Sequence, residues 1–227
     1  VAIWERNADR PGRRNVVSPA NFIRWTERAT SFSQMTALYD RRVSLTGRER
    51  PVELVAQTVM PNFFTTLGVT PALGRAFAPD EGPDGRDAVA VLSDAAWRRL
   101  FGADPGIVGR TILLNAQPVT VIGVAPRSFG FFLKAGSLVG KPPDLWLPFV
   151  FSAKSREPVG RWASAFGRLK DGVSLEKARS EMSGIAAGLT AEFPRFDTGW
   201  SVRLDPIRDE VSGDMAPALR VLSGGVA

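Results

Sequence analysis

The sequence predicts an α+β fold in which a smaller domain is inserted into a discontinuous one. Short strand-like and helix-like segments alternate along the 227 residues, and glycine or proline separates many of them. A strand, helix, strand pattern near the start is echoed near the end of the chain. The stretch 69–87 is rich in proline, glycine and acidic residues and has no regular pattern. We therefore expect one domain to be built from both ends of the chain, around an inserted segment.

The N-terminal part predicts a strand, a helix and a meander. Residues 1–4 are a strand-like apolar run, and Ser18 followed by Pro19 is a typical helix start. The next apolar stripe has helical spacing and comprises Phe22, Trp25, Thr26 and Ala29. We expect strands at 35–41, 43–46 and 52–60, with a turn at Gly47. A short helix after Pro61 should end at Gly68, where a left-handed residue is needed.

The inserted part predicts a strand, a helix and a hairpin. The strand covers 88–92, and Ser93 with Asp94 caps a helix that ends at Gly102. Strands at 111–114 and 119–124 flank residues 115–118, which is typical of a β-hairpin. Residues 129–143 are loop-like.

The C-terminal part predicts three strands and the strongest helix of the chain. The strands are 144–150, 162–169 and 199–206. The helix begins after Ser174 and ends at Pro194. Its apolar positions recur every three or four residues: Leu175, Ala178, Met182, Ile185, Leu189 and Phe193.

The composition excludes several kinds of chemistry. Hydrophobic residues make up 44% and charged residues 23%, as in a folded chain, but histidine and cysteine are both absent. These counts remove the imidazole base, the thiolate nucleophile, disulfides and most zinc, haem and iron-sulfur sites. We expect no catalytic residue, no cofactor and no metal. The acids Asp80, Glu81, Asp84 and Asp87 lack the register of a calcium loop and indicate a solvated acidic turn.

The basic charge permits more partners than it selects. The formal net charge is +6, which allows nucleic acid, an anionic membrane or an acidic ligand. Acidic residues are mixed among the N-terminal arginines, so we expect a solvated basic face and no nucleic-acid partner. The six tryptophans are spread through the elements and are interpreted as packing residues.

One motif matches a catalytic pattern. Ser174-Leu-Glu-Lys177 has the Ser-x-x-Lys spacing of a serine nucleophile activated by lysine. Its companion motifs are absent from the chain, and a serine at a helix start is the usual N-cap. We favour the capping role over a Ser-Lys hydrolase.

The apolar end, 215–227, is too short to cross a membrane, which takes ~20 residues. It fits either a frayed terminal helix or the first turns of a membrane helix.

Several ordered motifs resemble the periplasmic core domain of MacB-type ABC transporter permeases, most closely the large permease branch of acidobacteria. They are SPANFIRW at 18–25, MPNFFTTLGVTPALGRAF at 60–77, VAVLSDAAWRRLFG at 89–102, DPGIVGR at 104–110, LN at 114–115 and VIGVAP at 121–126. PIRDEVSGDMAPALR at 206–220 is similar to the approach to the second membrane span of those permeases. The resemblance therefore favours the onset of a truncated membrane helix at 213–227.

The resemblance implies a porter-like split βαβ subdomain, from residues 1–70 and 153–212, with a Sabre-like α/β subdomain inserted at 72–150. It implies a non-catalytic domain on the periplasmic face of the bacterial inner membrane. Its partners would be the membrane helices of the same permease, a cytoplasmic ATPase acting indirectly, and a second permease copy. The domain would relay ATP-driven motion to a substrate or partner, and both chain ends should emerge on the same side of one subdomain. The alternative is a secreted binding module for a peptide or anionic ligand.

Overall fold

The computed structural model describes residues 1–83, 85–132, 136–137 and 139–209. Two compact units divide these residues. The first unit comprises Val1–Ala37 and the described residues from Phe151 onward, and the second unit is Leu38–Val150. The predicted membrane-helix onset at 213–227 lies outside the described residues. The mixed α+β class predicted from the sequence is confirmed.

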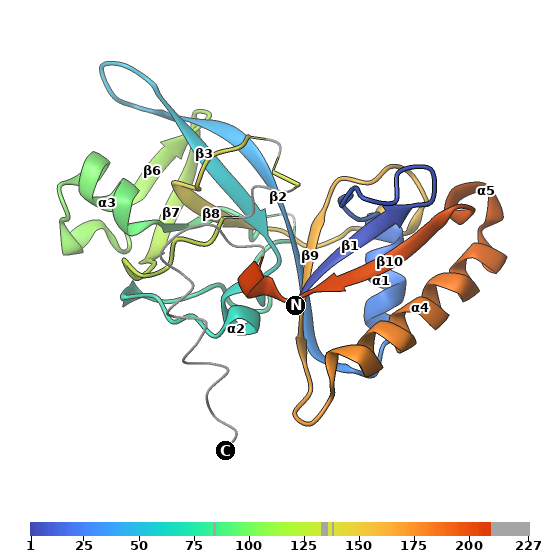
Figure 1. The fold of residues 1–227 in the computed structure, drawn as a ribbon. Coiled ribbons are helices and arrows are strands. Elements are labelled where there is room, and N and C mark those ends of the chain that lie inside the picture. The colour runs from blue at the N-terminus through green and yellow to red at the C-terminus, as the bar shows by residue number, and fades with distance from the viewer. Residues whose placement is uncertain (84, 133–135, 138, 210–227) are drawn as a thin grey trace. The chain divides into compact units, whose positions relative to one another are not determined.

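The sheet of the first unit has the strand order β10-β1-β9-β2. Its strands are β1 (Ala2–Asn7), the start of β2 (Phe32–Thr46), β9 (Ser164–Leu169) and β10 (Trp200–Asp205). Strand β1 pairs antiparallel with both β9 and β10. Its pairing with β10 runs from Ala2 opposite Asp205 to Asn7 opposite Trp200. Figure 1 shows β1 and β10 side by side. The first and last described strands therefore meet in one sheet.

Helices α1 (Pro19–Arg28), α4 (Leu175–Glu192) and α5 (Pro194–Asp197) complete this unit, with 3-10 turns η2 (Ala153–Arg156) and η3 (Ile207–Asp209). Helix α4 packs along β10 and contacts α1 and α5. Ala178, Met182 and Leu189 are its buried residues, as the predicted stripe requires. A helical spacing of apolar residues buries one face against the sheet.

The strands of the second unit close a circuit. They are the rest of β2, β3 (Val52–Val59), β4 (Leu73–Gly74), β5 (Val89–Leu92), β6 (Thr111–Leu114), β7 (Gln117–Val124) and β8 (Leu145–Pro148). Their order is β2-β3-β8-β5-β7-β4, and β6 pairs with both β2 and β7. The pairing β2-β3-β8-β5-β7-β6 thus returns to β2, as in a small barrel. Apolar side chains fill it, among them Leu45, Leu54, Ala90, Leu92, Val121 and Leu145.

Helices α2 (Phe63–Leu67) and α3 (Asp94–Phe101) and the 3-10 turn η1 (Pro105–Ile107) also belong to the second unit. Ser93 accepts a 3.1 Å hydrogen bond from Ala96 N–H, which confirms the predicted cap of α3. Gly68 and Gly102 close α2 and α3 with φ of 70° and 62°. The hairpin β6–β7 turns at Asn115 and Ala116, both with positive φ.

Some local expectations were wrong. The predicted strands 35–41 and 43–46 form one continuous strand, β2, because Arg41 and Arg42 pair in register with Ala56 and Val55 of β3. Ser18 makes no side-chain cap to α1, and Thr26 is exposed. Trp4, Trp25 and Trp146 are each 1% exposed, as packing residues should be, but Trp162 is 38% exposed.

The boundary of the units differs from the expected boundary at residue 70. Residues 38–70 group with the inserted segment, because β3 pairs in parallel with β8 from Ala56 opposite Leu145 to Val59 opposite Pro148. Leu54 and Ala56 share a core with Leu145 and Leu147. Strand pairing that is distant in sequence therefore decides where this part of the chain packs.

Candidate functional site

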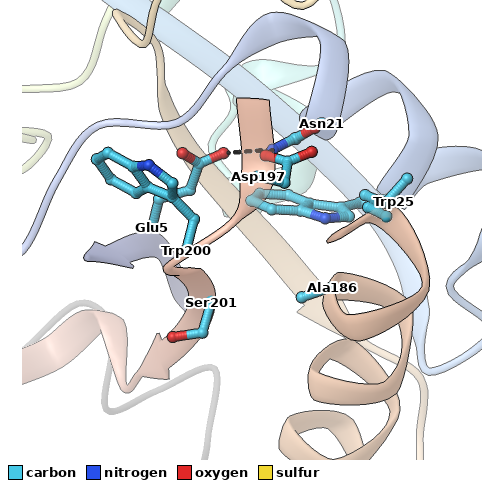
Figure 2. Close-up of a pocket in the computed structure, with 8 residues that line it drawn as sticks. Glu5, Asn21, Trp25, Ala186, Asp197, Trp200 and Ser201 are labelled. Atoms are coloured by element: carbon cyan, nitrogen blue, oxygen red, sulfur yellow. Dashed lines mark hydrogen bonds between the residues drawn. The ribbon is translucent and has the colours of Figure 1, made fainter. Parts of the chain in front are cut away.

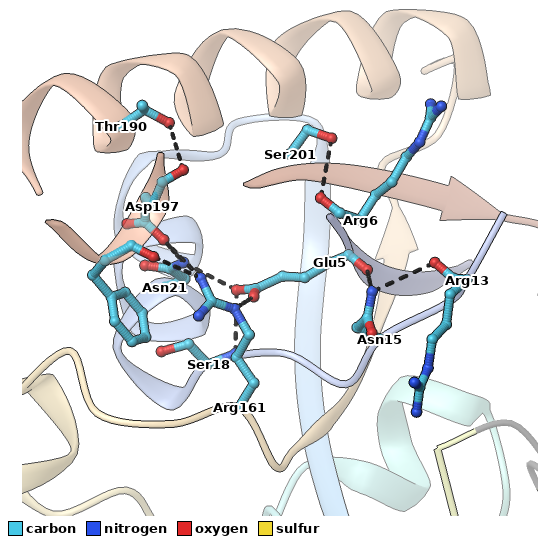
Figure 3. Close-up of polar contacts among 11 residues, drawn as sticks. Glu5, Arg6, Arg13, Asn15, Ser18, Asn21, Arg161, Thr190, Asp197 and Ser201 are labelled. Carbon is cyan, nitrogen blue, oxygen red and sulfur yellow. Dashed lines mark hydrogen bonds and ion pairs between the residues drawn. The ribbon is translucent and has the colours of Figure 1, made fainter. Parts of the chain in front are cut away.

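The first unit contains a buried ionic cluster that links four parts of the chain. Glu5 comes from β1, Asn21 from α1, Arg161 from the segment before β9, and Asp197 from α5 (Figure 3). Glu5 is 1% and Asp197 3% exposed. Two carboxylates thus lie around one guanidinium in a region where an unpaired charge is costly.

Arg161 forms ion pairs with Glu5 and with Asp197, the latter with Nη2 at 3.1 Å from Oδ1. Asn21 Nδ2 donates to Glu5 Oε1 at 3.0 Å and to Asp197 Oδ1 at 2.8 Å. The backbone N–H of Ser18 donates to Glu5 Oε1 at 3.2 Å, and Ser18 is buried. Burial raises the pKa of Glu5, while Arg161 and the hydrogen bonds from Asn21 and Ser18 oppose that rise.

Two aromatic rings flank the Arg161 guanidinium. Its carbon lies 3.6 Å from the centre of the Trp200 ring and 4.2 Å from that of Phe196. A cation over an aromatic face is stabilised by the ring quadrupole, more strongly where water is excluded. The rings therefore hold Arg161 in place between its two carboxylates.

A cavity of about 10 Å³ adjoins the cluster, lined by residues that include Glu5, Asn21, Trp25, Asp197 and Trp200 (Figure 2). This space corresponds to roughly one water molecule. Asn21 Oδ1, Asp197 Oδ2 and Trp25 Nε1 are buried without a protein partner among the described residues. The cluster joins four segments of the first unit through ion pairs and hydrogen bonds. Its residues include no activated nucleophile, and its cavity has no room for a substrate.

The structure confirms the capping role of Ser174. Its hydroxyl accepts a 3.2 Å hydrogen bond from the backbone N–H of Lys177 at the start of α4. A hydroxyl used in this way satisfies one of the free N–H groups of the helix end.

The acidic turn is partly ion-paired. Glu81 binds Arg75 at 2.7 Å and accepts from Ala78 N–H, and Asp80 binds Arg86 at 2.5 Å. Among the described residues, no group of three or more potential carboxylate ligands could hold a metal ion. Asp80 and Asp87 are exposed, as predicted for a solvated turn, whereas Glu81 is half-buried against Arg75, and Asp84 lies outside the described residues.

Two larger hollows were not predicted from the sequence. One, of about 350 Å³, lies in the first unit between α4 and β10 and is lined by Arg6, Arg179, Ser183 and residues 202–205. The other, of about 420 Å³, lies in the second unit beside the start of α3, over Phe129, Phe131 and Trp146. Their residues come from distant segments, and no local pattern marks them.

No helix in the described ranges combines the length and hydropathy required to cross a membrane.

Comparison with known proteins identifies the family. A family model described as MacB-like periplasmic core domain matches residues 5–185. The macrolide export ATP-binding/permease protein MacB of Burkholderia thailandensis is 33% identical over 145 residues, which are 64% of this chain and 21% of that protein. MacB of Escherichia coli K12 is 31% identical over 132 residues, 57% of this chain and 19% of that protein. The chain thus spans about a fifth of these relatives.

Solved structures share the fold. The periplasmic region of MacB from Actinobacillus actinomycetemcomitans has a TM-score of 0.60 at 14% identity, covering 100% of this chain and 93% of that one. The extracellular domain of the transporter YknZ from Gram-positive bacteria has a TM-score of 0.59 at 14% identity, covering 90% and 99%. The chain therefore belongs to the family of MacB-like periplasmic core domains of ABC transporter permeases.

Proposed function

We propose that this domain is the extracytoplasmic part of a MacB-type permease on the periplasmic face of the bacterial inner membrane. Membrane helices of the same permease would precede and follow it, and ATP would be hydrolysed by a separate cytoplasmic domain or subunit. The domain itself would be non-catalytic and would relay the ATP-driven motion of those helices to a substrate or partner. A second permease copy would complete the assembly.

The observation that carries this proposal is the pairing of β1 with β10. Ala2 lies opposite Asp205, so the first and last described strands leave the first unit next to each other. Two membrane helices attached at these points would act on the same sheet. The pairing of the first and last described strands supports the expectation that both chain ends emerge on the same side of one subdomain.

The two connections between the units are where a hinge movement would take place. The chain passes between them at residues 37/38 and 150/151, and each unit has its own core. Domains joined in this way can change their placement by hinge movement. We propose that ATP binding changes the placement of the two units, and that they correspond to porter-like and Sabre-like subdomains.

Two measurements test the membrane tether. The parent gene should encode an apolar span of ~20 residues on each side of this domain, since that length crosses a bilayer. A single cysteine introduced at the exposed Glu157 of the cysteine-free domain should react in intact cells with a maleimide that enters the periplasm but cannot cross the inner membrane. Flanks without a span, or labelling only after the inner membrane is permeabilised, would refute the proposed placement.

A further inference from the structure

The hollow between α4 and β10 concentrates positive charge. Arg6, Arg179 and Arg203 line it, and Asp205 is the one carboxylate among its lining residues. Asp205 is neutralised by Arg203 at 2.8 Å and by Arg14 at 3.3 Å. Three guanidinium groups therefore line the hollow against this one carboxylate. A concave surface of one charge sign raises the local concentration of counter-ions.

The arginines present free donors to the hollow. Arg179 uses Nε and Nη2 to bind the carbonyl oxygen of Leu204, at 3.1 and 2.8 Å, which leaves further N–H groups of its fork. The Arg6 side chain extends away from the buried ionic cluster (Figure 3) and makes no ion pair among the described residues. These groups are available to an anion that enters from solvent.

Strand β10 also presents main-chain N–H groups at the hollow. Ala8 N–H donates to Gly199 oxygen, so the main-chain groups of Gly199 point toward β1. Every second pair along the two strands has the same orientation, namely Arg6 opposite Ser201 and Trp4 opposite Arg203. Because main-chain groups alternate along an antiparallel pair, those of Val202 and Leu204 point away from β1. The bond from Arg179 to Leu204 oxygen agrees with this direction. Strand β10 ends the sheet, so the N–H groups of Val202 and Leu204 are presented beside the arginines.

Arginine forks, main-chain N–H groups and the Ser183 hydroxyl together form a donor set that suits phosphate oxygens. We propose that the hollow between α4 and β10 binds a phosphate-bearing ligand. Its volume of about 350 Å³ has room for a phosphate and the group attached to it. This assignment goes beyond the proposed function and does not depend on it.

A titration of the 227-residue chain with inorganic phosphate tests the site. Ionic strength is held constant with chloride, and the amide resonances of Val202 and Leu204 are followed by NMR. We expect saturable shifts with a Kd of about 1 mM or below. Arg6→Gln should weaken binding about tenfold, since a hydrogen bond to a charged group is lost. The exposed Arg10→Gln removes the same charge outside the hollow and should change the Kd less than about twofold, because its effect is only screened attraction.

Two further arms separate the sources of the phosphate. Soluble glycerol phosphate and vesicles of phosphatidylglycerol are compared, with phosphatidylcholine vesicles as the neutral control. If the chain binds phosphatidylglycerol vesicles and Arg6→Gln weakens this binding more than Arg10→Gln does, the ligand is a lipid headgroup. If the chain binds glycerol phosphate but not the vesicles, the ligand is soluble. The proposal is overturned if no phosphate probe gives saturable shifts at Val202 and Leu204, or if both variants weaken binding equally. Circular dichroism verifies that the variants fold, and Arg6 is suited to this test because its side chain is exposed.

Discussion

Arg161 is the residue on which the ionic cluster of the first unit depends. It is the only cation that pairs with both Glu5 and Asp197 in the described structure, and Trp200 and Phe196 hold it between them. Nothing in the sequence marked it. Glu5 is separated from it by 156 positions and Asp197 by 36, so no local spacing connects the three. A composition that excludes imidazole and thiolate chemistry says nothing of where carboxylates and arginines meet.

Arg161→Ala should destabilise the first unit strongly. The substitution leaves two buried carboxylates without their cation, which typically costs about 3–5 kcal/mol. Urea unfolding followed by circular dichroism measures the change. Arg195→Ala is a suitable control, because Arg195 lies on α5 close to the cluster but is exposed, and its loss should cost less than about 0.5 kcal/mol. Equal, small effects of the two variants would show that the cluster does not stabilise the fold.

At the scale of elements, helix caps and apolar spacing were the reliable signals. Ser93, Gly68 and Gly102 end or begin helices where the sequence indicated, because each cap depends on residues within one turn. The single long strand β2 was missed, since its continuity comes from pairing with β3 and not from its own composition. The close approach of the main chain at Gly123 was also not predicted from the sequence. A Cβ at this position would lie 2.5 Å from the Arg75 carbonyl oxygen, where β4 pairs with β7.

Helix α4 is fastened to the turn between α1 and β2 by Glu181. Its carboxylate accepts hydrogen bonds from Thr30 N–H at 2.7 Å, from the Thr30 hydroxyl at 2.6 Å and from Ser31 N–H at 2.9 Å. Partial burial alone would raise the pKa of Glu181, but these donors outweigh it and lower the pKa from 4.5 to about 2. The ionised form is therefore favoured in the folded chain.

Glu181→Gln should lower the free energy of unfolding at pH 7 by about 1–3 kcal/mol, because hydrogen bonds to a charged acceptor are lost. A lowered pKa in the folded state gives stability that is present above pH 4.5 and disappears as the pH falls toward 2. The difference between parent and variant should accordingly shrink across that range in urea titrations. Glu157→Gln, at an exposed position, should show no such convergence. A difference that stays constant with pH would contradict the role of the carboxylate.

At the scale of the whole molecule, two units with separate cores share one chain. The strand, helix, strand pattern at both ends led us to expect a discontinuous subdomain at 1–70 and 153–212, whereas the first unit joins Val1–Ala37 to the described residues from Phe151 onward. The first unit ends at Ala37, about 30 residues before the expected boundary, since the parallel pairing of β3 with β8 joins segments about 90 residues apart and leaves no local trace. The closure of the second unit through β6 likewise depends on a strand that pairs with two partners at once.

The most direct test of the relay is a distance measured between the two units in the intact permease. The domain has no native cysteine, so spin labels can be attached at Ser180→Cys in the first unit and Glu49→Cys in the second, both exposed positions. Labels at Asp9→Cys and Ser180→Cys, both in the first unit, provide the internal reference. We predict that ATP shifts the distance between units and leaves the reference distance unchanged. An identical distance between units with and without ATP would contradict the proposed relay.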